Sequence, residues 1–280
     1  MCAGSKACCL ISTLGWNGVV MVIAEWFLWL MSYSFIGWAY ESIICSIGQK
    51  ELINRGFLNG PVCPVYGFGA LAVIFFLDQR TYSIVMLFFI GMFLTCTVEY
   101  ITAILLEKLF NAKWWDYSQY RFNIQGRVSL LGAVVFGILS VLLIKYIHPF
   151  VGEMIGQMPA LLKIVLSIVI FILLMVDLSI TVRHLLILNS RLRDMQLAIN
   201  RFLEQYAKHA GGLKESLLSK FEENEFYNEH IKDLVSLSRF QNIRIVRAFP
   251  RLRSIHYDDA WQKFKSILLG TDSRNMKNYK

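Results

Sequence analysis

Charge is scarce in this sequence. Lys, Arg, Asp and Glu make up 17% of its 280 residues, against about a quarter in a typical soluble domain. Hydrophobic residues reach 56% and aromatic residues 14%, which is more than a soluble core of this length uses. The composition therefore excludes an ordinary soluble domain and indicates a protein whose solvent is lipid.

Several chemical signatures are also missing. The six cysteines include no CxxC pair, and no His stands at metal-ligand spacing, so we expect no metal site and no disulfide framework, and interpret the cysteines as packing residues. There is no Gly-rich loop ending in Gly-Lys-Ser/Thr, so ATP hydrolysis of the usual kind is not expected on this chain. No nucleophile with a plausible base is recognisable. We expect no cofactor, and the sequence leans away from an enzyme.

Long apolar windows are what the sequence has instead. Crossing the hydrocarbon core takes about 20 mostly apolar residues, and five windows meet or approach that length: residues 26–47, 60–77, 82–106, 128–147 and 160–182. The second is interrupted by Gly60, Pro61 and Pro64, so we expect it to begin as an irregular turn among its neighbours. The apolar run from Val19 to Ile47 is too long for a signal-peptide core. The prediction is an all-α, polytopic bundle of about five transmembrane helices.

Charge divides the chain into two parts. The first 182 residues carry ten Lys and Arg against nine Asp and Glu, whereas the segment from Arg183 onward carries eighteen against eleven. We therefore expect a transmembrane bundle over residues 1–184 and a basic, helical cytoplasmic tail over residues 185–280. The positive-inside rule then places the N-terminus outside and the C-terminus in the cytoplasm. On this topology the inner loops hold Lys50, Arg55, Lys108, Lys113, Arg121 and Arg127.

The predicted tail carries two amphipathic patterns. A heptad-like seam, typical of a coiled coil or a helical hairpin, consists of Leu185, Leu188, Leu192, Met195, Ile199, Phe202 and Tyr206. A second amphipathic stretch runs over residues 213–249. A basic amphipathic segment overlaps its end and contains Arg239, Arg244, Arg247, Arg251 and Arg253. Anionic lipid of the inner leaflet is its expected partner, and a solvated helix face is the alternative. Nucleic acid is not expected, because no recognition motif accompanies the charge.

Three acids lie inside the predicted spans: Glu41, Glu99 and Asp177. Counting from the outer end of each span at 1.5 Å per residue puts all three roughly 22 to 26 Å deep, near the inner leaflet. Bare acids among lipid tails are costly, so such residues normally face the bundle interior, pair, or line a hydrated cavity. Either each acid is structural, pinned by an Arg or by a hydrogen bond, or the three converge on a polar site.

The two inner loops are similar to each other. Residues 55–69 and 114–127 each place an Arg, an Asn and a Gly before a span, and each follows a span with a deep Glu. This pattern indicates a distant repeat, with a site at the interface of its halves. Glycines with an Arg at a helix N-terminus suit a phosphate or carboxylate; tight turns with an interfacial aromatic belt are the alternative. The predicted substrate-binding vestibule on the cytoplasmic side consists of Glu41, Arg55, Asn59, Glu99, Asp116, Asn123, Arg127 and Asp177.

Several motifs in order resemble one bacterial family. They are Ser34-Phe35-Ile36-Gly37-Trp38 leading to Glu41, the run Arg55 to Gly69, Val98-Glu99-Tyr100, and Trp115-Asp116-Tyr117-Ser118 with Asn123 to Arg127. Over roughly residues 20–185 the chain is similar to the family labelled putative ABC-transporter type IV, or CmpB-like. The resemblance implies a multi-pass bacterial plasma-membrane protein of the permease type, whose ATPase would be a separate subunit. A second copy of the chain is a further partner left open.

Three classes of function remain at this point. The leading hypothesis is a transport or permease component in which the vestibule binds a small polar or anionic solute. The second is an intramembrane enzyme acting on a lipid headgroup, since Arg, Asn, Glu and Asp can hold a phosphate and move a proton. The third is a scaffold or sensor that uses the basic helical tail.

Overall fold

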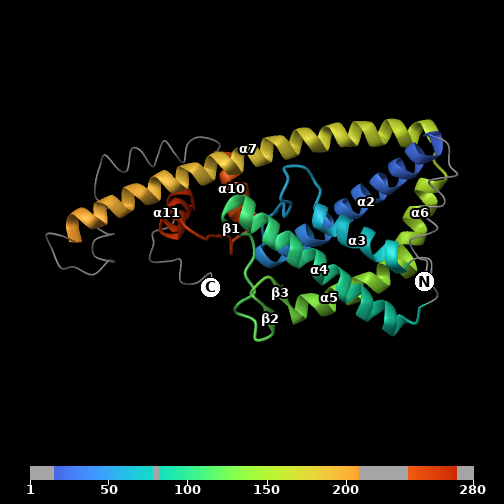
Figure 1. Ribbon diagram of the computed structural model, residues 1–280, viewed down its shortest axis with the longest axis horizontal. Helices are drawn as coiled ribbons and strands as arrows, with labels where there is room; N and C mark the ends of the chain where they lie inside the picture. Colours follow the sequence, from blue (N-terminus) through green and yellow to red (C-terminus); the bar gives the residue numbers. More distant parts are fainter. Residues whose placement is uncertain (1–15, 78–81, 208–238, 270–280) are drawn as a thin grey trace. The chain divides into compact units, whose positions relative to one another are not determined.

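The computed structural model describes residues 16–77, 82–207 and 239–269. These residues fall into two compact units, each of which is described by itself. Unit 1 comprises Met1–Thr102 and Tyr117–Ile180, and unit 2 comprises Ala103–Asp116 and Thr181–Lys280. Figure 1 shows that the described chain is mostly helical, and its strands are two residues long.

The helices confirm the predicted membrane architecture. They are α2 (Trp16–Gln49), α3 (Pro64–Leu77), α4 (Ile84–Phe110), α5 (Leu130–Leu142), the π-helical turn η1 (Leu143–Ile147), α6 (His148–Gly156) and α7 (Ala160–Ala207). Four stretches of the described chain are long and apolar enough to cross a membrane: Gly18–Gly48, Ile84–Phe110, Leu130–Gly156 and Ala160–Arg201. The second predicted window contains α3, whose 14 residues extend for only about 21 Å. The helix α3 is therefore too short to cross the hydrocarbon core unaided.

Small residues let the helices of unit 1 approach closely. A methyl group at Gly67 of α3 would overlap the Ser34 hydroxyl and lie 2.5 Å from the Leu30 carbonyl oxygen of α2. Gly91 of α4 packs in the same way against Ser140 of α5. Close contact of this kind holds helices together where lipid is as apolar as the side chains.

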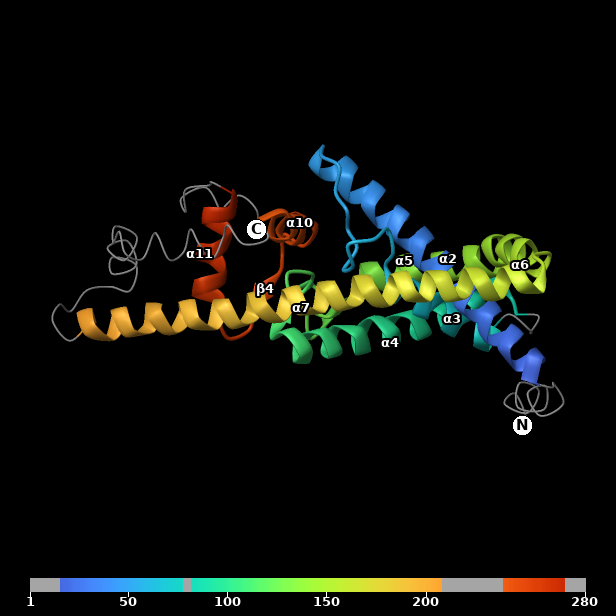
Figure 2. The same cartoon turned by 90° about the horizontal axis from the view of Figure 1, so that it is seen from above.

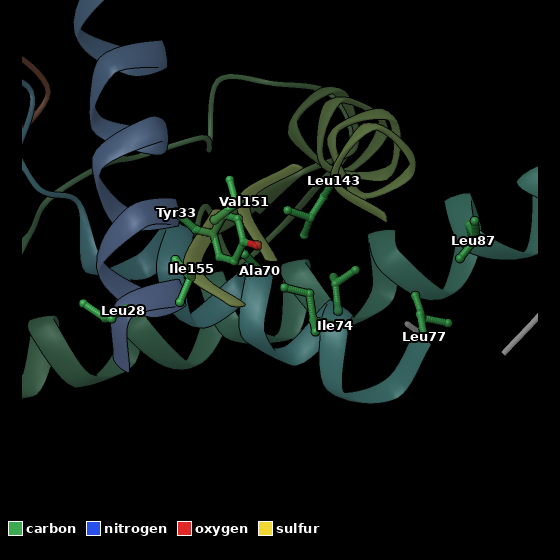
Figure 3. Close-up of a cluster of buried hydrophobic side chains, with 10 residues drawn as sticks. Leu28, Tyr33, Ala70, Ile74, Leu77, Leu87, Leu143, Val151 and Ile155 are labelled. Carbon is green, nitrogen blue, oxygen red and sulfur yellow. The ribbon is translucent and has the colours of Figure 1, made fainter. Parts of the chain in front are cut away.

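One apolar cluster joins most of the unit 1 helices. As Figure 3 shows, Tyr33 of α2 lies among side chains from α3, η1 and α6. The buried members are Leu28, Tyr33, Ala70, Val73, Ile74, Leu77, Leu87, Leu143, Val151 and Ile155. Dispersion contacts among these side chains fix the short helix α3 inside the bundle.

The segment between α2 and α3 runs back along α2, as Figure 2 shows. The backbone N–H of Arg55 donates to Ser42 Oγ at 3.2 Å, and that of Cys63 donates to the Ser34 carbonyl oxygen at 2.9 Å. Ser34 lies fifteen residues before the end of α2 at Gln49, which is about 22 Å along the helix axis. The segment therefore re-enters the bundle with its backbone groups bonded to protein, the condition for irregular backbone at membrane depth. The predicted irregular start of the second window is confirmed.

A π-helical turn interrupts the third long apolar stretch. The backbone N–H of His148 donates to the Leu143 carbonyl oxygen, five residues earlier. Pro149 follows directly, and a proline inside a helix removes one donor and crowds the preceding turn. The wider turn accommodates that proline, since π-bulges and prolines are the usual causes of such irregularities.

A hairpin precedes α5. Its strands are β2 (Asn123–Ile124) and β3 (Val128–Ser129), which pair antiparallel. Gln125 and Gly126 both have positive φ, 53° and 71°, the pattern of a type I′ turn. Ser129 then caps α5 by accepting the Gly132 N–H at 3.1 Å, so the hairpin fixes where α5 begins.

Unit 2 contains the second half of α7 and the described C-terminal elements. These are α10 (Arg239–Ala248), β4 (Arg253–Ser254), which pairs with β1 (Ala112–Lys113), and α11 (Asp258–Leu269). Trp261 of α11 is 1% exposed, and its indole N–H donates to the Leu252 carbonyl oxygen at 2.7 Å. Gln196 of α7 accepts the Ala260 N–H at 3.0 Å. The N-terminal end of α11 is therefore fixed on α7.

The seam predicted from the sequence is buried inside unit 2. Its members Leu185, Leu188, Leu192, Met195 and Ile199 are at most 9% exposed. His184, next to the seam, bonds Asn242 of α10 at 3.0 Å. Helices of the same chain therefore bury part of the seam. Pairing of the seam with another chain stays a prediction. The side chains of Phe202 and Tyr206, and residues 213–238 of the second amphipathic stretch, lie outside the described residues.

Candidate functional site

A cavity of about 240 Å³ lies in unit 1 between α2, α3, α4, α5 and η1, and its wall is almost wholly apolar. The lining residues are Tyr33, Ile36, Gly37, Tyr40, Val65, Tyr66, Gly69, Ala70, Val73, Thr95, Glu99, Phe136, Leu139, Ser140, Leu143 and Ile147. Glycine and alanine on α2 and α3 leave the space that larger side chains would fill. Concave apolar sites with few polar groups are the usual form of a small-molecule site.

Most polar atoms of this wall already have partners. The Thr95 hydroxyl donates to the Gly91 carbonyl oxygen of its own helix at 2.7 Å. The Ser140 hydroxyl donates in the same way to Phe136 at 2.8 Å. The Tyr33 phenol lies 2.7 Å from His148 Nδ1. These hydroxyl groups therefore shape the cavity, and the bonds just described already use their hydrogen-bonding capacity.

Glu99 differs from these groups. Its side chain lines the cavity, and the residue is only 7% exposed. The atom Oε1 accepts a long hydrogen bond of 3.5 Å from the Tyr117 phenol, whereas the buried atom Oε2 has no hydrogen-bond partner among the described residues. An unsatisfied buried carboxylate oxygen is costly and needs an explanation, and a ligand atom would supply one.

The pKa of Tyr117 indicates which charged groups lie near Glu99. The pKa of its phenol is raised, first by burial and then by the negative charges of Glu99 and Glu41, while Arg55 opposes the shift. The phenol therefore stays protonated and acts as a donor to Glu99. Glu41, Arg55 and Glu99 consequently lie within electrostatic reach of one phenol.

Glu41 adjoins the cavity through Tyr66. The Tyr66 phenol, which lines the cavity, lies close to the Glu41 carboxylate, and Arg55 lies within electrostatic range of the same acid. Cys63 Sγ is 4.0 Å from Glu41 Oε2. The structure thus brings Glu41, Arg55 and Glu99, three residues of the predicted vestibule, into one cluster; we call these residues with Tyr66 and Tyr117 the polar cluster.

Asp177 holds the re-entrant segment. Its Oδ1 accepts the backbone N–H of Asn59 at 3.1 Å and the side-chain amide of Asn59 at 2.8 Å. Its Oδ2 accepts the Gly60 N–H at 2.8 Å. A methyl group at Gly60 would lie 3.2 Å from that oxygen, so glycine suits the position. Asp177 and Asn59 therefore attach the segment to α7.

Asn54 organises the same segment from within. Its Oδ1 accepts the indole N–H of Trp38 at 2.7 Å and the backbone N–H of Gly56 at 3.0 Å. Its Nδ2 donates to the Asn59 carbonyl oxygen at 2.9 Å. The segment that carries Arg55 is thereby held against both α2 and α7.

Asn123 and Arg127 belong to the hairpin. The Asn123 amide donates to the Tyr120 carbonyl oxygen at 2.7 Å and accepts the Gly126 N–H at 2.8 Å. Arg127 hydrogen bonds Gln125, and its guanidinium lies 5.5 Å from the centre of the Tyr100 ring. Asn123 therefore stabilises its own turn, while Arg127 forms a cation–π contact on α4.

Asp116, the remaining predicted site residue, belongs to unit 2. Its carboxylate lies 4.0 Å from Arg253 Nη1. Arg253 also lies 3.8 Å from Asp258 Oδ2. Within unit 2, Asp116 thus helps to neutralise an arginine on β4.

Several residues of the site are not evident from the sequence. Tyr66 and Tyr117 stand in the two loop motifs, yet nothing in their spacing marks them as partners of the glutamates. Asn54 directly precedes the first motif-bearing loop and carries no pattern of its own. The available signal is weak, because the tyrosines next to the deep acids in the sequence are Tyr40 and Tyr100. Among the described residues, no group of three or more His, Cys, Asp or Glu side chains is arranged to hold a metal ion.

Comparison with known proteins places the chain in a family. Searches of curated proteins and of solved structures found no match. The family model described as Putative ABC-transporter type IV matches residues 28–182, which include the cavity and the polar cluster. Because this match spans more than half of the chain and the helices are long enough to cross a bilayer, the protein is a multi-pass membrane protein of the Putative ABC-transporter type IV family.

Proposed function

We propose that this protein is a transport component that binds a small solute inside unit 1, with the solute's polar group at the polar cluster and the remainder in the apolar cavity. The observation that carries this proposal is the 240 Å³ cavity lined by Glu99, whose buried Oε2 has no hydrogen-bond partner among the described residues. A purely structural acid would be expected to have both oxygens satisfied.

The polar cluster offers both signs of charge to a solute. Arg55 would attract an anionic group, and Glu41 and Glu99 would balance that charge or bind a cationic group. Tyr117 donates a long hydrogen bond to Glu99, and Tyr66 lies close to Glu41. The cluster can therefore orient a polar or ionic group while the apolar wall excludes water.

The topology of transport follows from the charge pattern. We propose a bacterial plasma membrane with the N-terminus outside and the C-terminus in the cytoplasm, so that the polar cluster opens to the cytoplasmic side. Because the sequence has no Gly-rich ATP-binding loop, ATP-driven transport would need a separate ATPase subunit.

The basic face of the C-terminal region supports a proposed contact with anionic lipid. Arg247 and Arg251 are exposed, whereas Ile245 and Val246 are buried within unit 2. The apolar side of α10 is therefore not available for insertion, and the attraction would be electrostatic, worth about 1 kcal/mol per arginine near the surface. Binding to vesicles that contain phosphatidylglycerol should fall steeply with salt; salt-independent binding would contradict this.

Flux in proteoliposomes tests the transport proposal. Liposomes with the purified chain are loaded with radiolabelled amines, organic acids and amino acids, and efflux is compared with protein-free liposomes. We expect faster efflux of at least one class, and loss of that efflux in Ala70→Phe, which places a ring in the cavity. The exposed Glu153→Gln is the matched control and should retain it. Equal efflux from wild type and Ala70→Phe would remove the cavity from the transport path.

A further inference from the structure

The cavity of unit 1 has a chemical character that selects among solutes. Its wall contains four aromatic rings, from Tyr33, Tyr40, Tyr66 and Phe136, and one carboxylate, from Glu99. No Lys, Arg or His of the described part of the chain lines it. An anionic ligand would therefore meet only negative charge and π faces in the cavity itself.

The Glu99 carboxylate has unused hydrogen-bonding capacity. Thr95 and Ser140 donate their hydroxyls to their own helices, and the Tyr66 phenol lies close to Glu41. The Oε2 of Glu99 is buried without a hydrogen-bond partner among the described residues. A donor brought by the ligand would satisfy this oxygen, and a positively charged donor would in addition offset the cost of an acid at membrane depth.

We propose that the cavity binds amphipathic cations: molecules with a compact apolar or aromatic body and one protonated amine, which pairs with the carboxylate of Glu99. This inference rests on the proposed function and names its substrate class. The rings of Tyr40, Tyr66 and Phe136 add cation–π attraction to the ammonium group, which is strongest where water is excluded. The apolar wall accepts the body of the ligand, so charge and hydrophobic burial act together.

Three probes that share one body test the class. Phenylbutylamine, phenylbutanol and phenylbutyrate differ only in a cationic, neutral or anionic end group. Binding to the full-length chain in lipid nanodiscs is measured by calorimetry at neutral pH, with empty nanodiscs subtracted for partitioning into lipid. We expect the amine to bind more tightly than the alcohol by about tenfold to a hundredfold, the range for one charged hydrogen bond, and the anion to bind no better than the alcohol.

Two substitutions test whether Glu99 is the residue that binds the amine. Glu99→Gln should weaken amine binding by about tenfold to a hundredfold while leaving the alcohol unchanged. Glu153→Gln removes an exposed acid of α6 and is the matched control, with no expected change. Equal affinity for the three end groups, or amine binding unaffected by Glu99→Gln, would overturn the inference. If the alcohol still binds and is lost in Ala70→Phe, the cavity remains a solute site and only the substrate class is wrong; if no probe binds, the proposed function fails with it.

Photolabelling of the wild-type chain gives a readout that does not depend on any variant folding. A diazirine-bearing phenylbutylamine is irradiated with the protein in nanodiscs, and the labelled peptides are mapped by mass spectrometry. We expect labels on α2, α3 and η1 residues of the cavity wall, suppressed by excess phenylbutylamine and not by phenylbutyrate. Labels confined to the lipid-facing surface, with no suppression, would overturn the inference.

Discussion

Replacing Asp177 should release the re-entrant segment. Its carboxylate accepts two backbone N–H groups, from Asn59 and Gly60, and one side-chain amide. Asp177→Ala leaves both backbone donors without this acceptor, at about 1–3 kcal/mol for each buried donor that water does not reach. Because these groups are half-buried, we take the loss to be about 3 kcal/mol for local opening of the segment.

The buried thiol of Cys63 reports this opening. Cys63 lies three residues after Gly60 and is 7% exposed, so a maleimide reaches it only when the segment opens. If opening and closing are fast compared with the reaction, the labelling rate follows the open fraction, and about 3 kcal/mol corresponds to roughly a hundredfold faster labelling. The rate is measured for the Cys63 peptide by mass spectrometry, which separates it from the other cysteines.

Asp194→Ala is the matched control on the same helix. Asp194 lies 3.6 Å from Arg193, and both side chains are largely exposed, so their pairing is worth about 0–1 kcal/mol. Labelling of Cys63 should not change in this variant. An unchanged Cys63 rate in a folded Asp177→Ala protein would refute the view that Asp177 holds the segment on α7.

The remaining predictions concern packing. Gly67→Ala should lower the free energy of unfolding by about 1–3 kcal/mol, because the added methyl group has no room. In Gly48→Ala the added methyl group meets nothing within 4 Å, so this control should be neutral. Thermal melting in detergent compares the two variants. Tyr33→Phe removes the buried bond to His148, and we expect a loss of about 1–3 kcal/mol in the same assay. Trp261→Ala should cost about 3–5 kcal/mol within unit 2, detected as faster proteolysis of the C-terminal region; a protease-resistant variant would contradict its role as a core residue.

The candidate site was only partly readable from the sequence. Glu41 and Glu99 attract notice because an acid in an apolar span is expensive, and Arg55 because it follows the first span. Their partners Tyr66 and Tyr117 come from α3 and from the loop before the hairpin, and pairing across such distances depends on how helices pack. Asp177 shows the same limit: its depth is evident from the span, but its bonds to Asn59 and Gly60 require the segment to fold back along α2.

The length of the apolar windows determines, from the sequence by itself, that the chain is a membrane-spanning helical bundle, because lipid permits few other structures. The distribution of Lys and Arg likewise determines that its C-terminal region is basic. Only the tertiary structure decided three features. They are the cavity, the Glu99 oxygen without a hydrogen-bond partner among the described residues, and the burial of the Leu185–Ile199 seam. Those features depend on which helix faces which, and on where small residues such as Gly67 allow close approach. Helices that are apolar all round carry no sequence signal for that choice.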